Sequence, residues 1–345
     1  MDALKKERIA LEVIKTLKSR FDNFPEDALN NRNAPFHEAF LEAFKVKIEK
    51  HVTDIPIFIS LASWMHGLNT TLGQTFFENI SHVLCNGEKR EFKGLLINQE
   101  QQKTITEIIT SLKNKNKIPN LYEENKVLHQ AKGELNQSIQ NFTADIYFEE
   151  DDNIVAIELK TVKPNSGIFK SEKEKILYAK AALKNRYPEK EIYYYLGFPF
   201  DPLNETSCGF NKERFFSYGI DFKKFYDHNE VLLADELWDF LSQEKNTMQT
   251  ILEIINSIST TDFMEKYNLI NDKNSFLTDS KKHEAILREW NLFREIELSH
   301  KFNILLNKAI SNSTIKRLLN NNLFDTKGIY KEDRINSLLK LIRDN

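Results

Sequence analysis

The chain has 345 residues, 41% hydrophobic and 29% charged, a balance typical of a globular protein with one large or two smaller cores. Its formal net charge of −3 does not indicate a nucleic-acid partner, so any DNA-binding surface must be local. Cys85 and Cys208 form no disulfide or metal-binding pattern, which favours a reduced, cytoplasmic compartment. No apolar run is long enough to span a membrane, and the N-terminus lacks a signal peptide's apolar segment.

The first 70 residues show helical spacing of apolar side chains. This spacing predicts a helix from Leu4 to Phe21 and a second from Ala34 to Lys50, so we expect residues 1–70 to form a helical N-terminal region. A third helix is expected at Thr71–Leu84, where apolar residues recur every four positions and Glu78 lies among them. A first strand at Lys89–Leu96 and a helix at Gln99–Leu112 follow.

The most informative stretch is Thr143–Lys160. Two apolar runs, Ala144–Phe148 and Ile154–Leu159, flank an acidic turn, and this arrangement predicts a β-hairpin. Side chains alternate along a strand, so Glu158 and Lys160 project from one face while Val155, Ile157 and Leu159 project from the other.

The predicted hairpin carries a candidate metal site. Asp145 and Glu158, on adjoining strands, are hard oxygen ligands of the kind that Mg²⁺ takes from proteins, and the backbone carbonyl of Leu159 is a third. Lys160 is placed to orient the attacking water and to offset negative charge in the transition state. The alternative is a surface hairpin whose Glu and Lys form an ion pair worth about 0–1 kcal/mol.

A basic segment follows the hairpin. We expect a helix from Ser171 to Arg186, with Ser171 as its N-cap and Glu174 completing a capping box. Residues 161–190 contain eight Lys or Arg and three Glu, in contrast to the acidic chain as a whole. The predicted contacts with DNA phosphates are Lys163, Lys170, Lys173, Lys180 and Lys184. The alternative is an ordinary solvated helix face.

The remaining predicted elements indicate an α/β fold. Glu191–Phe200 predicts a strand beside the Glu158 strand, which gives residues 71–228 a mixed sheet flanked by helices. Helical periodicity dominates afterwards, starting at Val231–Leu241 and including Ala285–Leu306. We expect residues 229–345 to form a helical C-terminal region that serves dimerisation, DNA recognition or both.

These residues carry a family resemblance. Asp145, Glu158 and Lys160 resemble the PD-(D/E)XK nuclease signature, with Ala144 where that family often has proline. The string ADIYF…IVAIELKTVKPNSGIFKSEKEKILYAKAALK resembles type II restriction endonucleases of the TdeIII group, as does LGQTFFENISHVL at Leu72–Leu84. The likeness spans roughly Leu72 to Pro202.

The resemblance implies a function. It implies a PD-(D/E)XK core that hydrolyses double-stranded DNA at a short palindromic site, with Mg²⁺ as cofactor and Mn²⁺ as a substitute, leaving 5′-phosphates. Asp145 and Glu158 would hold the metal, with Glu78 supporting them from the preceding helix. A palindromic site favours a homodimer. The resemblance further implies a cognate DNA methyltransferase as a genetic partner and GGNCC as the recognition site.

Two other functions fit the same residues. One is a repair or junction-resolving nuclease of the same fold, which would cut by DNA structure with little dependence on sequence. The other is a non-catalytic DNA-binding protein with a relic site, although the intact Asp145, Glu158 and Lys160 argue against it.

Overall fold

The computed structural model describes residues 1–25, 41, 50, 55–161, 166–219, 221–272, 274–310 and 312–343. The chain divides into two units: one holds Met1 and Phe77–Thr250, and the other holds Asp2–Phe76 and Ile251–Asn345. Among the described residues, no helix is both long enough and apolar enough to cross a membrane.

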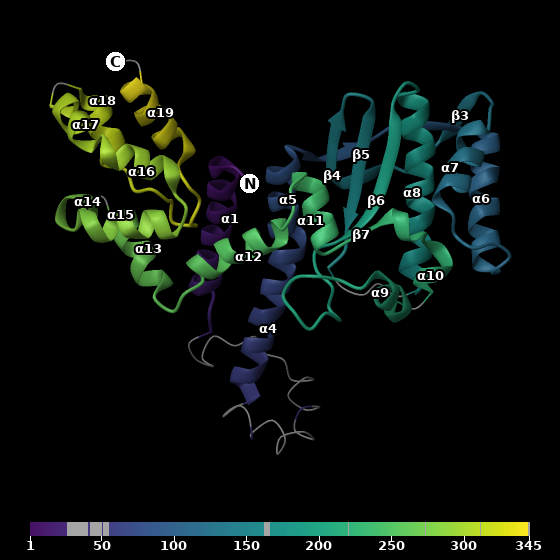
Figure 1. Ribbon diagram of the computed structural model, residues 1–345, viewed down its shortest axis with the longest axis horizontal. Coiled ribbons are helices and arrows are strands. Elements are labelled where there is room, and N and C mark those ends of the chain that lie inside the picture. The colour runs from purple at the N-terminus through teal and green to yellow at the C-terminus, as the bar shows by residue number, and fades with distance from the viewer. Residues whose placement is uncertain are drawn as a thin grey trace. The chain divides into compact units, whose positions relative to one another are not determined.

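A five-stranded mixed sheet with the order β1-β4-β5-β6-β7 lies at the centre of the first unit (Figure 1). β1, β4 and β5 are antiparallel neighbours, whereas β5, β6 and β7 run parallel to one another. β2 and β3 form a separate antiparallel pair. The strands are β1 Glu88–Phe92, β2 Leu96–Asn98, β3 Leu135–Ser138, β4 Phe142–Glu150, β5 Asn153–Leu159, β6 Glu191–Phe198 and β7 Val231–Leu233.

Helices cover both faces of this sheet. α5 and α11 pack on one face, α8 packs on the other, and α6 and α7 pack against α8 (Figure 1). β5 is therefore buried on both sides, which explains why it reads as a nearly continuous apolar run. The helices of this unit are α5 Phe77–Cys85, α6 Gln99–Lys113, α7 Leu121–Gln130, α8 Ser166–Arg186, α9 Lys212–Tyr218, α10 Phe222–Phe225, the 3₁₀ helix η2 His228–Glu230 and α11 Asp235–Ser242.

The second unit is helical in its described part. Its buried aromatic side chains include Phe263, Tyr267 and Trp290, whose rings lie against one another. The elements are α1 Ala3–Asp22, α4 Ile55–Thr71, the π-helix η1 Leu72–Phe76, α13 Phe263–Asn271, α14 Ser275–Thr278, α15 Ser280–Glu289, α16 Phe293–His300, α17 Phe302–Ala309, α18 Ser313–Leu319 and α19 Glu332–Arg343, and α12 Thr247–Ile258 runs from the first unit into it.

Several predicted elements are confirmed. The hairpin exists with Ile146 opposite Ile157. β6 lies beside β5, as expected, and the structure shows that the two strands are parallel. The predicted α/β class with a mixed sheet is also confirmed. The helix expected at Ala34–Lys50 lies outside the described residues, apart from two isolated positions.

The helix predicted at Val231–Leu241 is wrong in its first residues. Val231–Leu233 form β7, the last strand of the sheet, and the helix begins at Asp235. Short apolar runs fit a buried strand and a buried helix equally well, so only pairing with β6 distinguishes them.

Three other predicted helices differ from the structure. The one at Thr71–Leu84 contains the π-helical turn η1, because a regular apolar spacing does not reveal a locally wider turn. The segment Ala285–Leu306 is divided among α15, α16 and α17. The third, α8, begins at Ser166, so Ser171 is not an N-cap; its hydroxyl donates to the carbonyl of Ile168 within the helix.

Buried charges fix α8 in place. Lys173 Nζ lies 2.6 Å from a carboxylate oxygen of Glu124 on α7 and 2.6 Å from one of Glu230 in η2. Lys180 Nζ lies 3.4 Å from Glu230. Burial acts to lower the pKa of Lys173, but the charges of Glu230 and Glu124 outweigh it and raise that pKa, so Lys173 remains an ammonium ion.

The structure contradicts the prediction that Lys173 and Lys180 contact DNA. Their side chains are 0% and 1% exposed, and carboxylates already neutralise them. Lys184 donates to the carbonyl of Lys190 and pairs with Glu191, and its contact with DNA stays a prediction. Lys163 lies outside the described residues, and Lys170, half-buried on α8, stays a predicted phosphate contact.

We expect Lys173→Ala to lower the free energy of unfolding by about 3–5 kcal/mol, because it leaves buried carboxylates without their main partner. Lys170→Ala, on the same helix but outside the cluster, should change it by less than about 0.5 kcal/mol. Urea unfolding monitored by circular dichroism measures both. An unchanged unfolding midpoint for Lys173→Ala would contradict the buried cluster.

We also expect Gly197→Ala to destabilise the first unit by about 1–3 kcal/mol through overpacking. A Cβ at Gly197 would lie 2.9 Å from Ile157 Cγ2, 3.0 Å from Leu159 Cδ2 and 3.3 Å from Leu237 Cδ1. The same unfolding measurement tests this, and wild-type stability would show that α11 can move away from the sheet at little cost.

Candidate active site

The candidate site lies where β4 and β5 separate. Their ladder ends at the pair Ile146 and Ile157, and beyond it the side chain of Asp145 accepts a hydrogen bond from the backbone N–H of Leu159 at 2.9 Å. Leu159 also pairs with Gly197 of β6, so β5 continues straight while β4 diverges. The Asp145 carboxylate thus takes the place of a backbone partner in the fork.

Asp145 belongs to a small charged group with α5 and β1. Lys89 Nζ lies 3.5 Å from an Asp145 oxygen and 2.9 Å from a Glu78 oxygen, so it bridges the two carboxylates. The ring of His82 contacts the backbone carbonyl of Asp145 at 2.7 Å through Nε2. The structure therefore brings Glu78 beside Asp145, with an ammonium group between them.

Glu158 is held by two lysines. Lys160 Nζ lies 2.9 Å from Oε1, and Lys175 Nζ, from α8, lies 2.7 Å from Oε2. Glu172, also on α8, pairs with Lys160 at 3.1 Å and with Lys175 at 3.7 Å. Glu158 and Glu172 thus share two ammonium groups.

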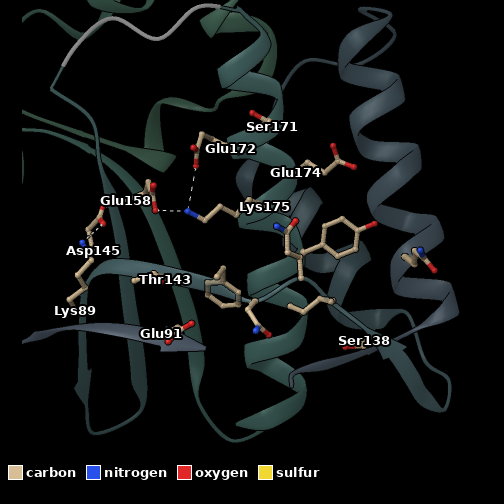
Figure 2. A pocket seen from close by; sticks show the side chains of 16 residues that line it. Lys89, Glu91, Ser138, Thr143, Asp145, Glu158, Ser171, Glu172, Glu174 and Lys175 are labelled. Carbon is tan, nitrogen blue, oxygen red and sulfur yellow. Dashed lines mark hydrogen bonds and ion pairs between the residues drawn. The ribbon is translucent and has the colours of Figure 1, made fainter. Parts of the chain in front are cut away.

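Five of these residues line one cavity of about 950 Å³. Figure 2 shows Asp145 and Lys89 on one side, Glu158 close to Asp145, and Glu172 and Lys175 reaching toward Glu158 from α8. The lining includes Asp145, Glu158, Lys89, Glu172 and Lys175. The two carboxylates predicted to act together therefore open onto the same space.

The electrostatics favour an added positive charge. Burial and the negative charge of Glu158 raise the pKa of Asp145, although the hydrogen bond from Leu159 acts against them. Burial lowers the pKa of Lys160, but the charges of Glu158 and Glu172 outweigh it and raise that pKa. Glu158 thus makes Asp145 harder to ionise, while the neighbouring carboxylates hold Lys160 in its charged form.

A buried hydroxyl lies near these carboxylates. Tyr194 of β6 is 1% exposed, and no hydrogen-bond partner of its hydroxyl is found among the described residues. Burial, and then the charges of Glu158 and Asp145, raise its pKa well above the usual value. Tyr194 is thus a neutral donor near the acidic groups.

The donor set fits a hard divalent cation. Asp145 and Glu158 offer only oxygen, and the backbone of Leu159 lies directly beside Asp145. No cluster of three or more His, Cys, Asp or Glu side chains suited to a metal ion occurs in the described ranges. Mg²⁺ needs no such cluster, because it keeps several waters and binds proteins through one or two carboxylates.

Three charged residues of the site were not identified from the sequence. Lys175 and Glu172 stand three positions apart on α8, and this spacing places them on one helix face. Their relation to Glu158 depends on how α8 packs on the sheet. Lys89 comes from the irregularity in β1 between Glu88 and Arg90, which has no sequence signature.

Comparisons with known proteins identify the family of the chain. Residues 4–259 match the family model described as "Type II restriction endonuclease, HinfI". The chain is also 44% identical to the type II restriction enzyme MjaII of Methanocaldococcus jannaschii, over 97% of this chain and 96% of that protein. It is accordingly a site-specific endonuclease whose substrate is DNA, and it belongs to the HinfI family of type II restriction endonucleases.

Proposed function

We propose that the cavity at the β4–β5 fork is the catalytic site of a Mg²⁺-dependent restriction endonuclease with a PD-(D/E)XK core. One observation carries the proposal: Asp145 and Glu158, from adjoining strands, face the same cavity with the ammonium of Lys160 beside Glu158. Carboxylates and ammonium groups that gather at one cavity are typical of functional sites.

Each residue has a role in this proposal. Asp145 and Glu158 would hold the metal with the carbonyl of Leu159, and Glu78 would support Asp145 through Lys89. A bound Mg²⁺, or Mn²⁺ in its place, would polarise the phosphate and lower the pKa of a coordinated water. Lys160 would orient the attacking water, because Glu158 and Glu172 restrict its ammonium group.

The reaction we propose is hydrolysis by in-line displacement. The water oxygen bonds to phosphorus, the bond from phosphorus to the 3′-oxygen breaks, and a 5′-phosphate and a 3′-hydroxyl result. The proposed substrate is a short palindromic duplex bound by a homodimer in the cytoplasm, because the symmetry of the protein then mirrors that of the site. GGNCC and membership of the TdeIII group stay predictions.

Digestion of a plasmid of known sequence tests the function. With Mg²⁺ we expect discrete fragments whose ends DNA ligase rejoins directly, since ligase requires 5′-phosphates and 3′-hydroxyls. Chelation of the metal with EDTA should abolish cleavage. A smear, or cuts confined to branched DNA, would count against recognition of a specific sequence.

Substitution of the proposed catalytic residues tests the site. Asp145→Asn, Glu158→Gln and Lys160→Ala should each lower the single-turnover cleavage rate constant by about 100-fold or more, because the first two weaken metal binding and the third removes the ammonium that orients the water. Lys113→Ala, an exposed lysine at the end of α6, is the matched control and should cut at the wild-type rate. Wild-type cleavage by Asp145→Asn would place the active site elsewhere.

A further inference from the structure

We propose that Lys175 is a second catalytic ammonium, which contacts a non-bridging oxygen of the phosphate being cleaved. This inference rests on the proposed function of the same cavity. Lys175 lies on α8, separate from the β-hairpin that carries Asp145, Glu158 and Lys160.

The first support is the contact between Lys175 and Glu158. The two carboxylate oxygens of Glu158 are divided between two cations: Lys160 approaches Oε1 and Lys175 approaches Oε2, and the Lys175 contact is the shorter, at 2.7 Å against 2.9 Å. Lys175 is therefore as close to this proposed metal ligand as the motif lysine is. A phosphate close enough to meet Asp145 and Glu158 through a shared cation would come close to Lys175.

The second support is its exposure to the cavity. Lys175 belongs to the cavity lining, with its side chain 30% exposed, whereas the side chain of Lys160 is 22% exposed and is not part of that lining. Figure 2 shows the side chain of Lys175 extending from α8 toward Glu158, with its ammonium between Glu158 and Glu172. A group in the cavity would reach Lys175 without any movement of the strands.

The third support is the rigid anchoring of α8. Lys173, two residues earlier, is buried in contact with Glu124 and Glu230, so the backbone that carries Lys175 is tied to α7 and η2. Glu172 then restricts the ammonium of Lys175 by an ion pair across one helical turn. Preorganised cations of this kind stabilise transition-state charge because they need little rearrangement during the reaction.

A merely structural role for Lys175 predicts different behaviour. Lys160 remains beside Glu158 when Lys175 is removed, so loss of this part-buried pair should cost the fold little, and in a merely structural role it would leave metal binding and chemistry largely unchanged. As a catalytic cation that also competes for Glu158, Lys175 should affect metal binding and cleavage in opposite directions. Its removal should strengthen binding of a divalent cation, because a competing charge is lost, and slow the cleavage step.

The experiment compares wild type, Lys175→Ala, Lys175→Arg and the control Lys113→Ala. Mn²⁺ binding without DNA is measured by electron paramagnetic resonance, and thermal unfolding and DNA affinity in Ca²⁺ are measured in parallel. The single-turnover rate constant is measured on a supercoiled plasmid that the wild type cuts. For Lys175→Ala we expect a rate about 100-fold lower, tighter Mn²⁺ binding, and nearly unchanged melting temperature and DNA affinity. Lys175→Arg should recover part of the rate, because it keeps the positive charge.

Near wild-type cleavage by Lys175→Ala would overturn the proposal, and so would a lost activity accompanied by a lower melting temperature or by weaker Mn²⁺ binding. Asp145→Asn separates this failure from that of the proposed function. If Asp145→Asn cuts like the wild type, the active site is elsewhere and both proposals fail. If Asp145→Asn is inactive, the results for Lys175 concern that residue alone.

Discussion

The site depends on the fork in which Asp145 accepts the N–H of Leu159. At this point an ordinary ladder would pair backbone with backbone, but a side-chain carboxylate occupies the position and β4 turns away. The fork places one acid in the gap and leaves Glu158 facing the same cavity. Two negative charges held together in a mostly buried position are costly, so the surrounding chain must supply cations. It does so from three elements: Lys89 comes from β1, Lys160 from the end of β5, and Lys175 from α8.

Helix α8 carries charged residues on two sides, one facing the protein interior and one facing the cavity. Lys173 and Lys180 point inward and meet Glu124 and Glu230, whereas Glu172 and Lys175 face the cavity. The inward pairs explain how a helix with so many lysines packs against a buried sheet, because each enclosed ammonium has a carboxylate beside it. A helix anchored in this way holds its outward groups at a fixed distance from the strands, and that is the condition an active site needs.

The same helix shows what sequence reasoning could and could not reach. That Lys173, Lys180 and Lys184 share a helix face follows from their spacing, but spacing does not say whether the face meets solvent or buried acids from η2, about 50 residues further along the chain. The hairpin was predictable because its signal is local: two apolar runs, an acidic turn, and alternation that pairs Glu158 with Lys160. β7 could not be predicted, because its three apolar residues form a strand only when β6 lies beside them. Lys89 and Lys175 were not identified as site residues from the sequence, because their positions in the site depend on tertiary packing.

The charge balance links the metal and the DNA in the proposed function. In the structure described here, the carboxylates of Asp145 and Glu158 are matched by ammonium groups that lie 2.7–3.5 Å away. A divalent cation at these carboxylates would compete with the same lysines, and the displaced ammonium groups would add positive charge to a cavity open to solvent. A phosphodiester suits such a cavity, because it brings negative charge and strong acceptor oxygens to ammonium groups that the metal has displaced from their carboxylates. Metal and DNA should therefore each favour the other's binding, as reciprocal coupling between two ligands requires. On this account the lysines that stabilise the site before the metal binds become groups that meet the substrate afterwards.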